Sequence, residues 1–330
     1  MSGLQYDISS LGEVGPKILA LLPEIAARAE ETEQARRLPA DLAAKLAEAG
    51  AFNLSKPASL GGLELEPLDF LKIVATVAEA DASAGWCVMI AVTSTLGAAY
   101  MPEPAAREIF GADDVVTGGV FAPMGKAEDK GDYYLLSGQW QWGSGSANCS
   151  WLGGGAMIFK DGELQKFDNG APYHRMLFFP AQQASLIDSW HVAGLKGTGS
   201  GDFSVEGIKV PKDRSVSFVG DRPRDPGALY KFPLFGLLAL GVSAVALGND
   251  GEISPKGRAN LRLACAHATE ISADICKTAY TLGGGSAVYS TSSLQRRFRD
   301  AHVATQHIAT APAVFELAGR TRTPISDSRF

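Results

Sequence analysis

Residues 189–211 read SWHVAGLKGTGSGDFSVEGIKVP, a glycine-rich turn that leads into an alternating segment. The Gly-x-Gly at residues 197–199 could belong to a dinucleotide-binding loop, but such a loop requires a helix directly after the glycines. Residues 202–210, DFSVEGIKV, follow instead, and their β-branched and aromatic residues predict a strand. The stretch therefore excludes a Rossmann site and indicates a β-domain in the middle of the chain.

Short segments of similar texture surround this strand and are separated by Gly, Asp and Pro. They include VVTGGVF (115–121), YYLLSGQWQW (133–142), WLGGGAMIF (151–159), MLFFP (176–180) and ASLIDSWHV (184–192). We interpret residues 113–222 as one β-domain of several short strands. The connector DRPRDPGALYKFP, residues 221–233, is long and proline-rich, and loops of this length are usually functional.

Helical patterns occupy both flanks of the β-domain. Apolar residues recur at three- and four-residue spacing over 14–110, and residues 69–100 are apolar nearly all round, which predicts a helix buried on every side. Residues 234–248 predict a core helix, 259–285 a long amphipathic helix ended by glycines, and 292–321 a final helix. We expect a mainly α chain with a central β-domain, in three parts: a helical domain at 1–112, the β-domain at 113–222 and a helical bundle at 223–330.

Composition and charge limit the partners. The 330 residues are 46% hydrophobic and 20% charged with a formal net charge of -6, so no basic surface favours nucleic acid or an anionic membrane. We see no apolar run of eighteen residues and no secretory signal, and we expect a cytoplasmic protein. The four cysteines form no C-x-x-C pair and are expected to be free thiols: Cys87, Cys149, Cys265 and Cys276.

Common catalytic and metal-binding motifs are absent from the sequence. There is no H-E-x-x-H, no phosphate-binding P-loop and no cluster of Cys and His at metal-ligand spacing. His302 and His307 lie five residues apart, which would place them on different faces of a helix, so we expect no metal site. Ser144 lies in a GSGS run that lacks the pattern of a nucleophile elbow.

Two glycine-containing segments carry alternative interpretations. In QWQWGSG, residues 139–145, the alternation of Trp140 and Trp142 predicts that both indoles share one face of a strand. They either pack in the core or form a wall against a planar ring, with the Ser144 hydroxyl free to bind ring heteroatoms. Gly284 and Gly285 lie between two predicted helices and either end the first helix or let a phosphate approach a helix end.

The order of helices, β-domain and helices, together with SWHVAGLKGTGSGDFSVEGIKVP and LQRRFRDAHVATQH (294–307), resembles the acyl-CoA dehydrogenase superfamily. The sequence is most similar to its reduced-flavin-dependent monooxygenase branch, the oxygenase components of two-component aromatic hydroxylases and of thiophene-sulfur and indole oxygenases. The resemblance runs over nearly the whole chain. It implies an N-terminal helical domain, a middle β-barrel, a C-terminal helical bundle and a homotetramer.

The resemblance also implies a flavin site. In that branch a turn like residues 140–145 lies against the flavin ring and its serine, here Ser144, hydrogen-bonds near the flavin N5 atom. His307 matches a histidine at the reactive edge of the ring, so Ser144 and His307 are the expected catalytic residues. The expected cofactor-binding residues are Trp142, Ser144, Gly145, Trp190, Thr198, Ser200, Gly284 and Gly285.

One position separates the two branches of the superfamily. Dehydrogenases often continue the Arg-Asp-Ala helix with I-Y-E-G, whose glutamate removes the substrate α-proton. Aligned on Arg299, that glutamate falls on Ile308, and an isoleucine cannot act as a base. The neighbouring His307 can donate a hydrogen bond or relay a proton at neutral pH. The resemblance therefore favours oxygenation over dehydrogenation, while an acyl thioester dehydrogenase and a non-catalytic partner with the same scaffold stay as alternatives.

The implied reaction needs a separate NAD(P)H flavin reductase, which supplies reduced FAD or FMN, and O2, which forms a C4a-(hydro)peroxyflavin that oxygenates a small aromatic or heteroaromatic substrate. Several relatives have a histidine where this chain has Ser94, so the substrate is more reasonably an indole-like molecule than a phenol. Ser94, Tyr230, Phe232 and Phe235 are the expected substrate-pocket residues.

A helical segment is expected to be missing near residues 249–251. The family usually continues from GVSAVALGN into two long helices, whereas here GVSAVALGND (241–250) runs directly into GEISPKGRANLRL (251–263). About 60–80 residues would be needed for two helices of about 40 Å and a turn. Without them, the C-terminal bundle would leave apolar helix faces without partners, so we expect the intact protein to carry the segment. The alternative is a real deletion that contacts between subunits compensate.

Overall fold

The computed structural model describes residues 7–231, 255–307 and 310–322. The chain divides into two compact units, which are treated separately below. The first comprises Met1–Leu65, Lys72–His191 and Lys196–Tyr230, and the second comprises Glu66–Leu71, Val192–Leu195 and Lys231–Phe330.

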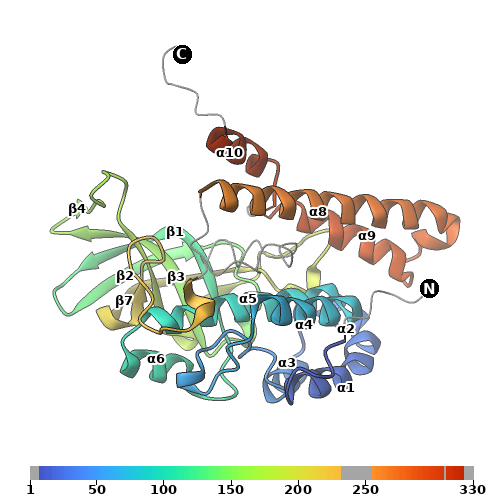
Figure 1. Cartoon of the computed structure of the whole chain (residues 1–330), viewed down its shortest axis with the longest axis horizontal. Coiled ribbons are helices and arrows are strands. Elements are labelled where there is room, and N and C mark those ends of the chain that lie inside the picture. Colours follow the sequence, from blue (N-terminus) through green and yellow to red (C-terminus); the bar gives the residue numbers. More distant parts are fainter. Residues whose placement is uncertain (1–6, 232–254, 308–309, 323–330) are drawn as a thin grey trace, which may run out of the picture. The chain divides into compact units, whose positions relative to one another are not determined.

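The N-terminal flank is helical, as predicted (Figure 1). Its helices are α1 (Val14–Ala27), α2 (Ala29–Ala35), α3 (Ala40–Glu48), α4 (Pro67–Ala80), α5 (Ala82–Thr95), which continues as the 3₁₀ turn Leu96–Tyr100, and α6 (Glu103–Phe110). Local sequence sets their ends. Pro39 precedes α3, Gly50 adopts a left-handed φ of 83° after it, and Asp81 caps α5 by accepting a hydrogen bond from the Ala84 amide at 2.8 Å.

The prediction of one helix over 69–100 that is buried on every side holds only in part, because the stretch divides at Asp81 and one face of α5 stays partly exposed. Nine of the 14 residues of α5 are buried, and Ala82–Tyr100 is long and apolar enough to cross a membrane by composition alone. However, 72% of that stretch lies inside the protein, as expected for a core helix. This helix is important because one of its side chains reaches the candidate site.

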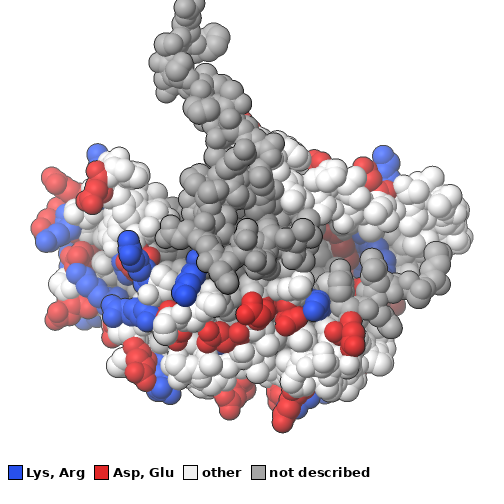
Figure 2. Space-filling view, viewed as in Figure 1, with Lys and Arg blue, Asp and Glu red and all other residues white. Residues whose placement is uncertain are grey.

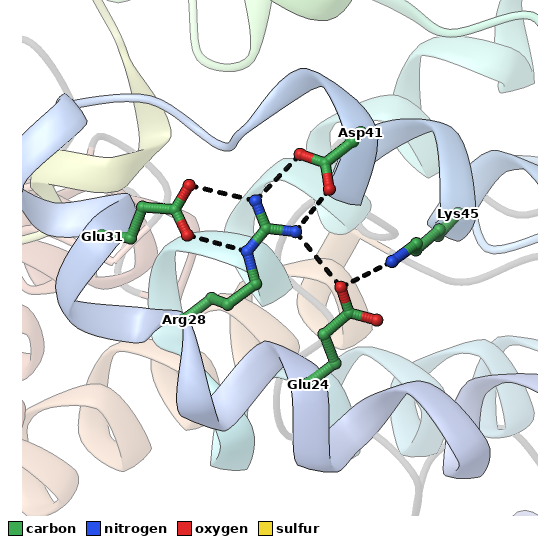
Figure 3. A network of polar contacts seen from close by, with 5 residues as sticks. All are labelled: Glu24, Arg28, Glu31, Asp41 and Lys45. Atoms are coloured by element: carbon green, nitrogen blue, oxygen red, sulfur yellow. Dashed lines mark hydrogen bonds and ion pairs between the residues drawn. The ribbon is translucent and has the colours of Figure 1, made fainter.

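Arg28 ties the first three helices together (Figure 3). Its guanidinium donates to Glu24 of α1 at 3.2 Å, to Glu31 of α2 at 2.8 Å and to Asp41 of α3 at 2.9 Å. Lys45 adds a second cation at 2.6 Å from Glu24. Hydrogen bonding from Arg28 lowers the pKa of Asp41 to about 2 and also lowers the pKa of Glu31.

An Arg28→Met substitution should lower the thermal unfolding midpoint at pH 7. Carboxylates with depressed pKa values contribute stability that is present above their unfolded pKa, about 4, and is lost as pH falls through the folded pKa, here about 2 for Asp41. The difference between variant and parent should therefore shrink between pH 5 and pH 2, in the approximate window that linkage sets. It should also shrink in 1 M salt, because these groups are exposed.

Thermal melts across this pH range measure the effect, with Lys17→Met as the control. Lys17 forms one exposed pair with Glu13 on α1, so its loss should change little. A constant destabilisation by Arg28→Met at all pH values would contradict an electrostatic role for the network.

The middle of the chain forms one eight-stranded sheet. The strands are β1 (Thr117–Asp129), β2 (Tyr133–Trp140), β3 (Trp151–Lys160), β4 (Glu163–Leu164), β5 (His174–Pro180), β6 (Ser185–Ile187), β7 (Asp202–Pro211) and β8 (Ser215–Val216). Their order is β6-β7-β2-β1-β3-β5-β8, with β4 paired to β3. The β1–β3 pair is parallel and the other pairs are antiparallel.

The expectations of a closed barrel and of a mainly α chain are not matched. The sheet is open: β6 and β8 are its two edges and pair with one inner neighbour each. These edges are three and two residues long, too short to complete the hydrogen-bonded ladder that closure requires. The architecture is helical domains with a substantial central sheet, and the predicted boundaries at residues 112 and 222 stay predictions.

Trp140 forms the centre of the sheet's core. It is fully buried, stacks on Phe203 with ring centroids 5.1 Å apart, and donates its indole N–H to the Gly155 carbonyl at 2.7 Å. A Cβ at Gly125 or at Gly154 would lie 2.6 or 2.5 Å from this indole, so glycines on neighbouring strands make room for the ring.

The prediction that Trp140 and Trp142 share one face is wrong. Strand β2 ends at Trp140, and Trp142 adopts a left-handed φ of 66° with 64% of its surface exposed. The alternation that sets side-chain direction holds only within a strand. Of the two interpretations, Trp140 therefore belongs to the core, and Trp142 alone is available as a wall.

The charged side chains are unevenly distributed on the visible face (Figure 2). Asp and Glu predominate over α1–α6, whereas Lys and Arg are interspersed with Asp and Glu over the strands.

Besides the start of α4, the second unit contains three helices among its described residues: α8 (Pro255–Leu282), α9 (Ser293–Ala304) and α10 (Ala313–Arg322), with the 3₁₀ turn Gly284–Val288 after α8. Tyr280 of α8 stacks on Phe298 of α9 with centroids 5.0 Å apart. The long helix ending at the glycines is thus confirmed. The single helix predicted over 292–321 is wrong, because α9 stops at Ala304 and α10 starts only after Pro312, which cannot continue a helix. The core helix predicted at 234–248 and the junction at 249–251 lie outside the described residues.

Candidate functional site

The turn after β2 is fastened to the loop before β7. The Gly143 amide donates to the Gly201 carbonyl at 2.9 Å, and the Gly145 amide donates to the Thr198 carbonyl at 2.8 Å. Gly145 has a φ of 71°, a conformation that favours glycine. These bonds bring Ser144 close to Thr198 and Ser200, which follow it by 54 and 56 positions in the chain.

A chain of hydroxyl groups runs through these loops. The Oγ atoms of Ser144 and Ser200 are 2.6 Å apart, and the Ser200 Oγ lies 2.6 Å from the Thr198 Oγ1. The indole N–H of Trp86, on α5, donates to the Ser144 Oγ at 3.1 Å. The three hydroxyl residues are nearly completely buried, so their hydrogen bonds are formed away from water.

This chain gives Ser144 a flexible hydrogen-bonding role. The Trp86 N–H can only donate, so it fixes one lone pair of the Ser144 oxygen. If Ser200 donates to Ser144, the Ser144 hydrogen is free for an acceptor on a ligand. If Ser144 donates to Ser200, its second lone pair is free for a ligand N–H. The Ser144 hydroxyl can therefore either accept a hydrogen bond from a ring N–H or donate one to an unprotonated ring nitrogen.

The surroundings of Ser144 fit a planar ring lying on the turn. A cavity of about 10 Å³ touches Ser144, Gly145 and Cys149, which is room for one water and not for a ring. A larger ligand must approach from the open side of the turn, where the Trp142 indole is 64% exposed. An exposed indole beside a buried hydroxyl offers one flat apolar surface and one directed polar contact, as a heteroaromatic cofactor requires.

The Trp190 loop is held by Arg36 at the end of α2. The Arg36 guanidinium donates to both carboxylate oxygens of Asp188, at 2.7 and 2.6 Å, and to the Trp190 carbonyl at 3.1 Å. Hydrogen bonding from Arg36 lowers the pKa of Asp188. On the other side of the loop, the Ser189 hydroxyl donates to Asp202 at 2.6 Å. The position of Trp190 is thus set by bonds from two elements.

An Arg36→Met substitution should weaken flavin binding roughly tenfold, the scale seen when a group that orients a site is removed. The methionine keeps the length of the side chain but loses all the bonds to the Trp190 loop. Flavin titration followed by fluorescence measures the effect. Arg37→Met is the matched control, because Arg37 is exposed, forms no hydrogen bond with the described residues, and acts on Asp188 only through its charge. Equal affinities in the two variants would remove Arg36 from the site.

His307 belongs to the second unit and lies in the turn after α9, not on a helix. Its carbonyl accepts hydrogen bonds from the amides of Thr310 and Ala311, both at 2.8 Å, which fixes its backbone. Burial lowers the pKa of its imidazole, so the ring is neutral at pH 7. A neutral imidazole can donate from one nitrogen and accept at the other.

The other predicted positions differ in how available they are. Gly284 has a φ of 57°, and a Cβ at Gly284 or Gly285 would meet no atom within 4 Å, so this turn is open. The hydroxyl of Tyr230 donates to the Ser55 carbonyl at 3.1 Å and is therefore committed to the backbone. Phe232 and Phe235 lie outside the described residues, as does Ile308.

Ser94 presents an unsatisfied group. Its Oγ is buried and has no hydrogen-bond partner among the described residues. Trp86, Ile90 and Ser94 are spaced four residues apart, so they share one face of α5, and all three are partly exposed where most of the helix is buried. This face presents the apolar side chains of Trp86 and Ile90 and ends at the Ser94 hydroxyl, which lacks a partner. Trp86 also contacts Ser144.

The prediction of free cysteines is confirmed for all four. Burial raises the pKa of Cys87, and it raises the pKa of Cys149 to about 12. Both thiols lie beside the Gly145 turn and stay protonated, which excludes a thiolate nucleophile there.

Trp86 and Arg36 were missed in the sequence interpretation. Their bonds to Ser144 and to the Trp190 loop join residues 58 and 152 or more positions apart. The only available signal was the Gly-Trp pair in the buried helix, since a tryptophan needs a partner for its N–H when it is buried.

Comparison with known proteins gives consistent matches. The N-terminal domain of acyl-CoA dehydrogenase matches residues 21–105, and the C-terminal domain of acyl-CoA dehydrogenase matches residues 238–312. The oxygenase subunit HsaA of a flavin-dependent monooxygenase from Rhodococcus jostii is 32% identical over 69% of this chain and 60% of its own length. Indole-3-acetate monooxygenase from Acinetobacter baumannii is 27% identical over 91% of this chain and 92% of its own. The chain thus spans about 60% of the length of the first of these curated relatives.

Solved structures share the fold. The 3-HSA hydroxylase from Rhodococcus sp. RHA1 superposes with a TM-score of 0.83 and 26% identity, covering 96% of this chain and 98% of that one. XiaF from Streptomyces, in complex with FADH2 and glycerol, gives a TM-score of 0.83 at 20% identity, covering 97% of this chain and 98% of that one.

Proposed function

The chain belongs to the acyl-CoA dehydrogenase superfamily, with oxygenase subunits of flavin-dependent monooxygenases among its homologues, and we propose that it is itself the oxygenase component of such a two-component enzyme. It would use reduced flavin and O2 to oxygenate a small aromatic or heteroaromatic molecule. A separate NAD(P)H flavin reductase would supply the flavin, and the assembly would be a homotetramer. We place the enzyme in the cytoplasm.

The observation that carries this proposal is the buried hydroxyl chain at Ser144, in the same turn that carries the exposed Trp142. Ser144 would hydrogen-bond a ring nitrogen, in either direction as the ring's protonation requires, while Trp86 and Ser200 hold its oxygen in place. Trp142 and Trp190 would lie against the ring. Gly284 and Gly285, whose turn in the second unit is open, stay proposed as cofactor-binding residues for the phosphate of FAD or of FMN. When bound, reduced flavin supplies the electrons that activate O2.

The substrate would lie along the partly exposed face of α5. Trp86 and Ile90 offer apolar contact, and the Ser94 hydroxyl lacks a partner that a substrate N–H or carbonyl could provide. A hydroxyl has no charge with which to pair, so a neutral heteroarene such as an indole fits better than a phenolate. Tyr230, Phe232 and Phe235 stay proposed as pocket residues, with Tyr230 contributing its ring and not its bonded hydroxyl.

Product analysis tests the proposal. The protein would be incubated with a flavin reductase, NADH and a panel of indoles, phenols and aryl sulfides under ¹⁸O₂. We expect one ¹⁸O atom in a product from one class of substrate. Reduction of bound flavin by an acyl-CoA, without incorporation of oxygen, would instead support the acyl thioester dehydrogenase. Absence of flavin binding would support a non-catalytic partner.

A His307→Ala substitution should divert reducing equivalents from product to hydrogen peroxide, lowering the product formed per NADH by roughly ten- to a hundredfold, the scale of a positioned proton donor. Because burial lowers the pKa of His307, its neutral form should predominate at and above neutral pH, and the coupling of the parent enzyme should change little there. Peroxide and product assays measure the ratio. His267→Ala, which removes an exposed histidine on α8, is the control. Unchanged coupling in His307→Ala would exclude the role.

We also propose that a helical segment is absent near residue 249. The match to indole-3-acetate monooxygenase covers 91% of this chain yet extends over 367 aligned positions, which supports extra residues in the relative within the match. Intact-mass spectrometry tests whether the purified protein carries them: a mass of 34.7 kDa corresponds to the sequence as it stands.

A further inference from the structure

A hollow of about 440 Å³ lies in the first unit, beside β5 and β8 and the segment that follows them. It is lined by Tyr100, Pro102, Arg175, Lys212, Asp213, Ser215, Asp221, Arg222 and Arg224. We infer that this hollow is a second ligand site, which binds the phosphate group of a small organic molecule. The inference goes beyond the proposed oxygenase function and does not depend on it.

Arg175 forms the rigid base of the hollow. Its side chain is 13% exposed, and every N–H of its guanidinium has an acceptor: the carboxylate of Asp221, the hydroxyl of Tyr173, and the hydroxyl and carbonyl of Ser215. Such an arginine has no donor left for a ligand. Its function is to fix the backbone around Asp221, from which the next residues project.

Arg222 and Arg224 provide the available donors. Both side chains are exposed, and neither guanidinium forms a hydrogen bond or ion pair with the described residues. The backbone that carries them is nonetheless fixed on both sides. The Asp221 amide donates to the Ser217 carbonyl at 2.7 Å, and the Arg224 amide donates to the Ala99 carbonyl at 2.7 Å. Pro223 restricts the backbone between the two arginines. Two unpaired guanidiniums are thus presented from an ordered segment.

Charge and shape favour phosphate over a carboxylate. Four cationic and two anionic side chains line the hollow, so its walls carry two net positive charges, which match a phosphate dianion. Lys212 is already paired with Asp129 at 2.7 Å, and Asp213 opposes an anion, so the attraction comes from the two free arginines. Their planar forks suit the several oxygens of a phosphate. The ring of Tyr100, which packs edge-on against Phe218 at 5.1 Å, offers apolar surface to the organic part.

The hollow is separate from the Ser144 turn. Trp86, which contacts Ser144, and Tyr100, which lines the hollow, lie on one continuous helical stretch, fourteen positions apart. At 1.5 Å per residue they are separated by about 20 Å. A small aromatic molecule cannot span that length, so a ligand here would act as a second molecule and not as the reacting substrate.

Inorganic phosphate is the probe for this site, because it contains the recognised group alone. Thermal melts of the intact protein would be recorded with increasing phosphate at constant ionic strength, adjusted with chloride. We expect a saturable rise in the unfolding midpoint, as for any ligand that binds the folded state. The double variant Arg222→Gln/Arg224→Gln should raise the apparent Kd at least tenfold, while Lys209→Gln, which removes an exposed cation on β7, should leave it unchanged.

Each alternative outcome would overturn the inference. Equal affinity for acetate would assign the hollow to carboxylates. A phosphate effect that persists in the double variant would place binding elsewhere. Competition between phosphate and FMN for the same arginines would make the hollow part of the flavin site and not a second one. If chloride alone raises the unfolding midpoint as much as phosphate does, the effect is charge screening and not phosphate binding.

Discussion

Replacing Ser144 with alanine should weaken flavin binding by roughly ten- to a hundredfold, because leaving a buried polar group without its partner costs about 1–3 kcal/mol. In the activity that is left, more of the reducing equivalents should form hydrogen peroxide and fewer should form product. The substitution removes the proposed hydrogen-bond partner of the ring. It also leaves the Trp86 N–H without its acceptor and the Ser200 hydroxyl without one of its two partners. Flavin affinity by fluorescence titration and the peroxide-to-product ratio are the two measurements.

The matched control is Ser146→Ala. Ser146 lies in the same turn and is about equally buried, but its hydroxyl takes no part in the chain of Ser144, Ser200 and Thr198. Ser200→Ala should give an intermediate result. It keeps the Ser144 hydroxyl, which is proposed to bind the ring, but removes the Ser200 hydroxyl, which lets Ser144 change between donor and acceptor. Unaltered flavin affinity and coupling in Ser144→Ala would remove the observation on which the proposed function depends.

Much of the fold follows from local patterns. The strand at 202–210 and the buried helix at 69–100 were predicted because apolar periodicity reflects which face is buried, and both are present as β7 and within α4 and α5. The errors occurred where one proline or one pair of distant bonds decides the structure. The helix expected over 292–321 breaks before Pro312, and the closure of the sheet depends on edge-strand lengths that no local pattern specifies.

The candidate site was only partly predictable for a similar reason. Ser144, Thr198 and Ser200 were identified by resemblance, and the structure places their hydroxyls in one chain. Trp86 and Arg36 were not identified. Their hydrogen bonds join residues far apart in sequence and follow from tertiary packing, so no local sequence pattern indicates them. The orphaned hydroxyl of Ser94 likewise becomes visible only when its surroundings are known.

The two tryptophans of residues 139–145 should respond to substitution in opposite ways. Trp140→Ala should lower the free energy of unfolding by about 3–5 kcal/mol, because it empties a space shaped by glycines on neighbouring strands. It also leaves the Gly155 carbonyl without its donor. Trp142→Ala should change stability by about 0.5 kcal/mol or less, since its ring is 64% exposed, and should instead weaken flavin binding.

Chemical denaturation in the absence of flavin separates the two effects, because it reports the stability of the protein alone. Flavin titration of Trp142→Ala and of Trp142→Phe then tests the wall: phenylalanine keeps a flat surface and should recover most of the affinity that alanine loses. If Trp142→Ala destabilises the protein as much as Trp140→Ala, both indoles belong to the core. If Trp142→Ala changes neither stability nor affinity, the ring must lie on another surface of the turn, and Ser144 would have to bind it without a tryptophan beside it.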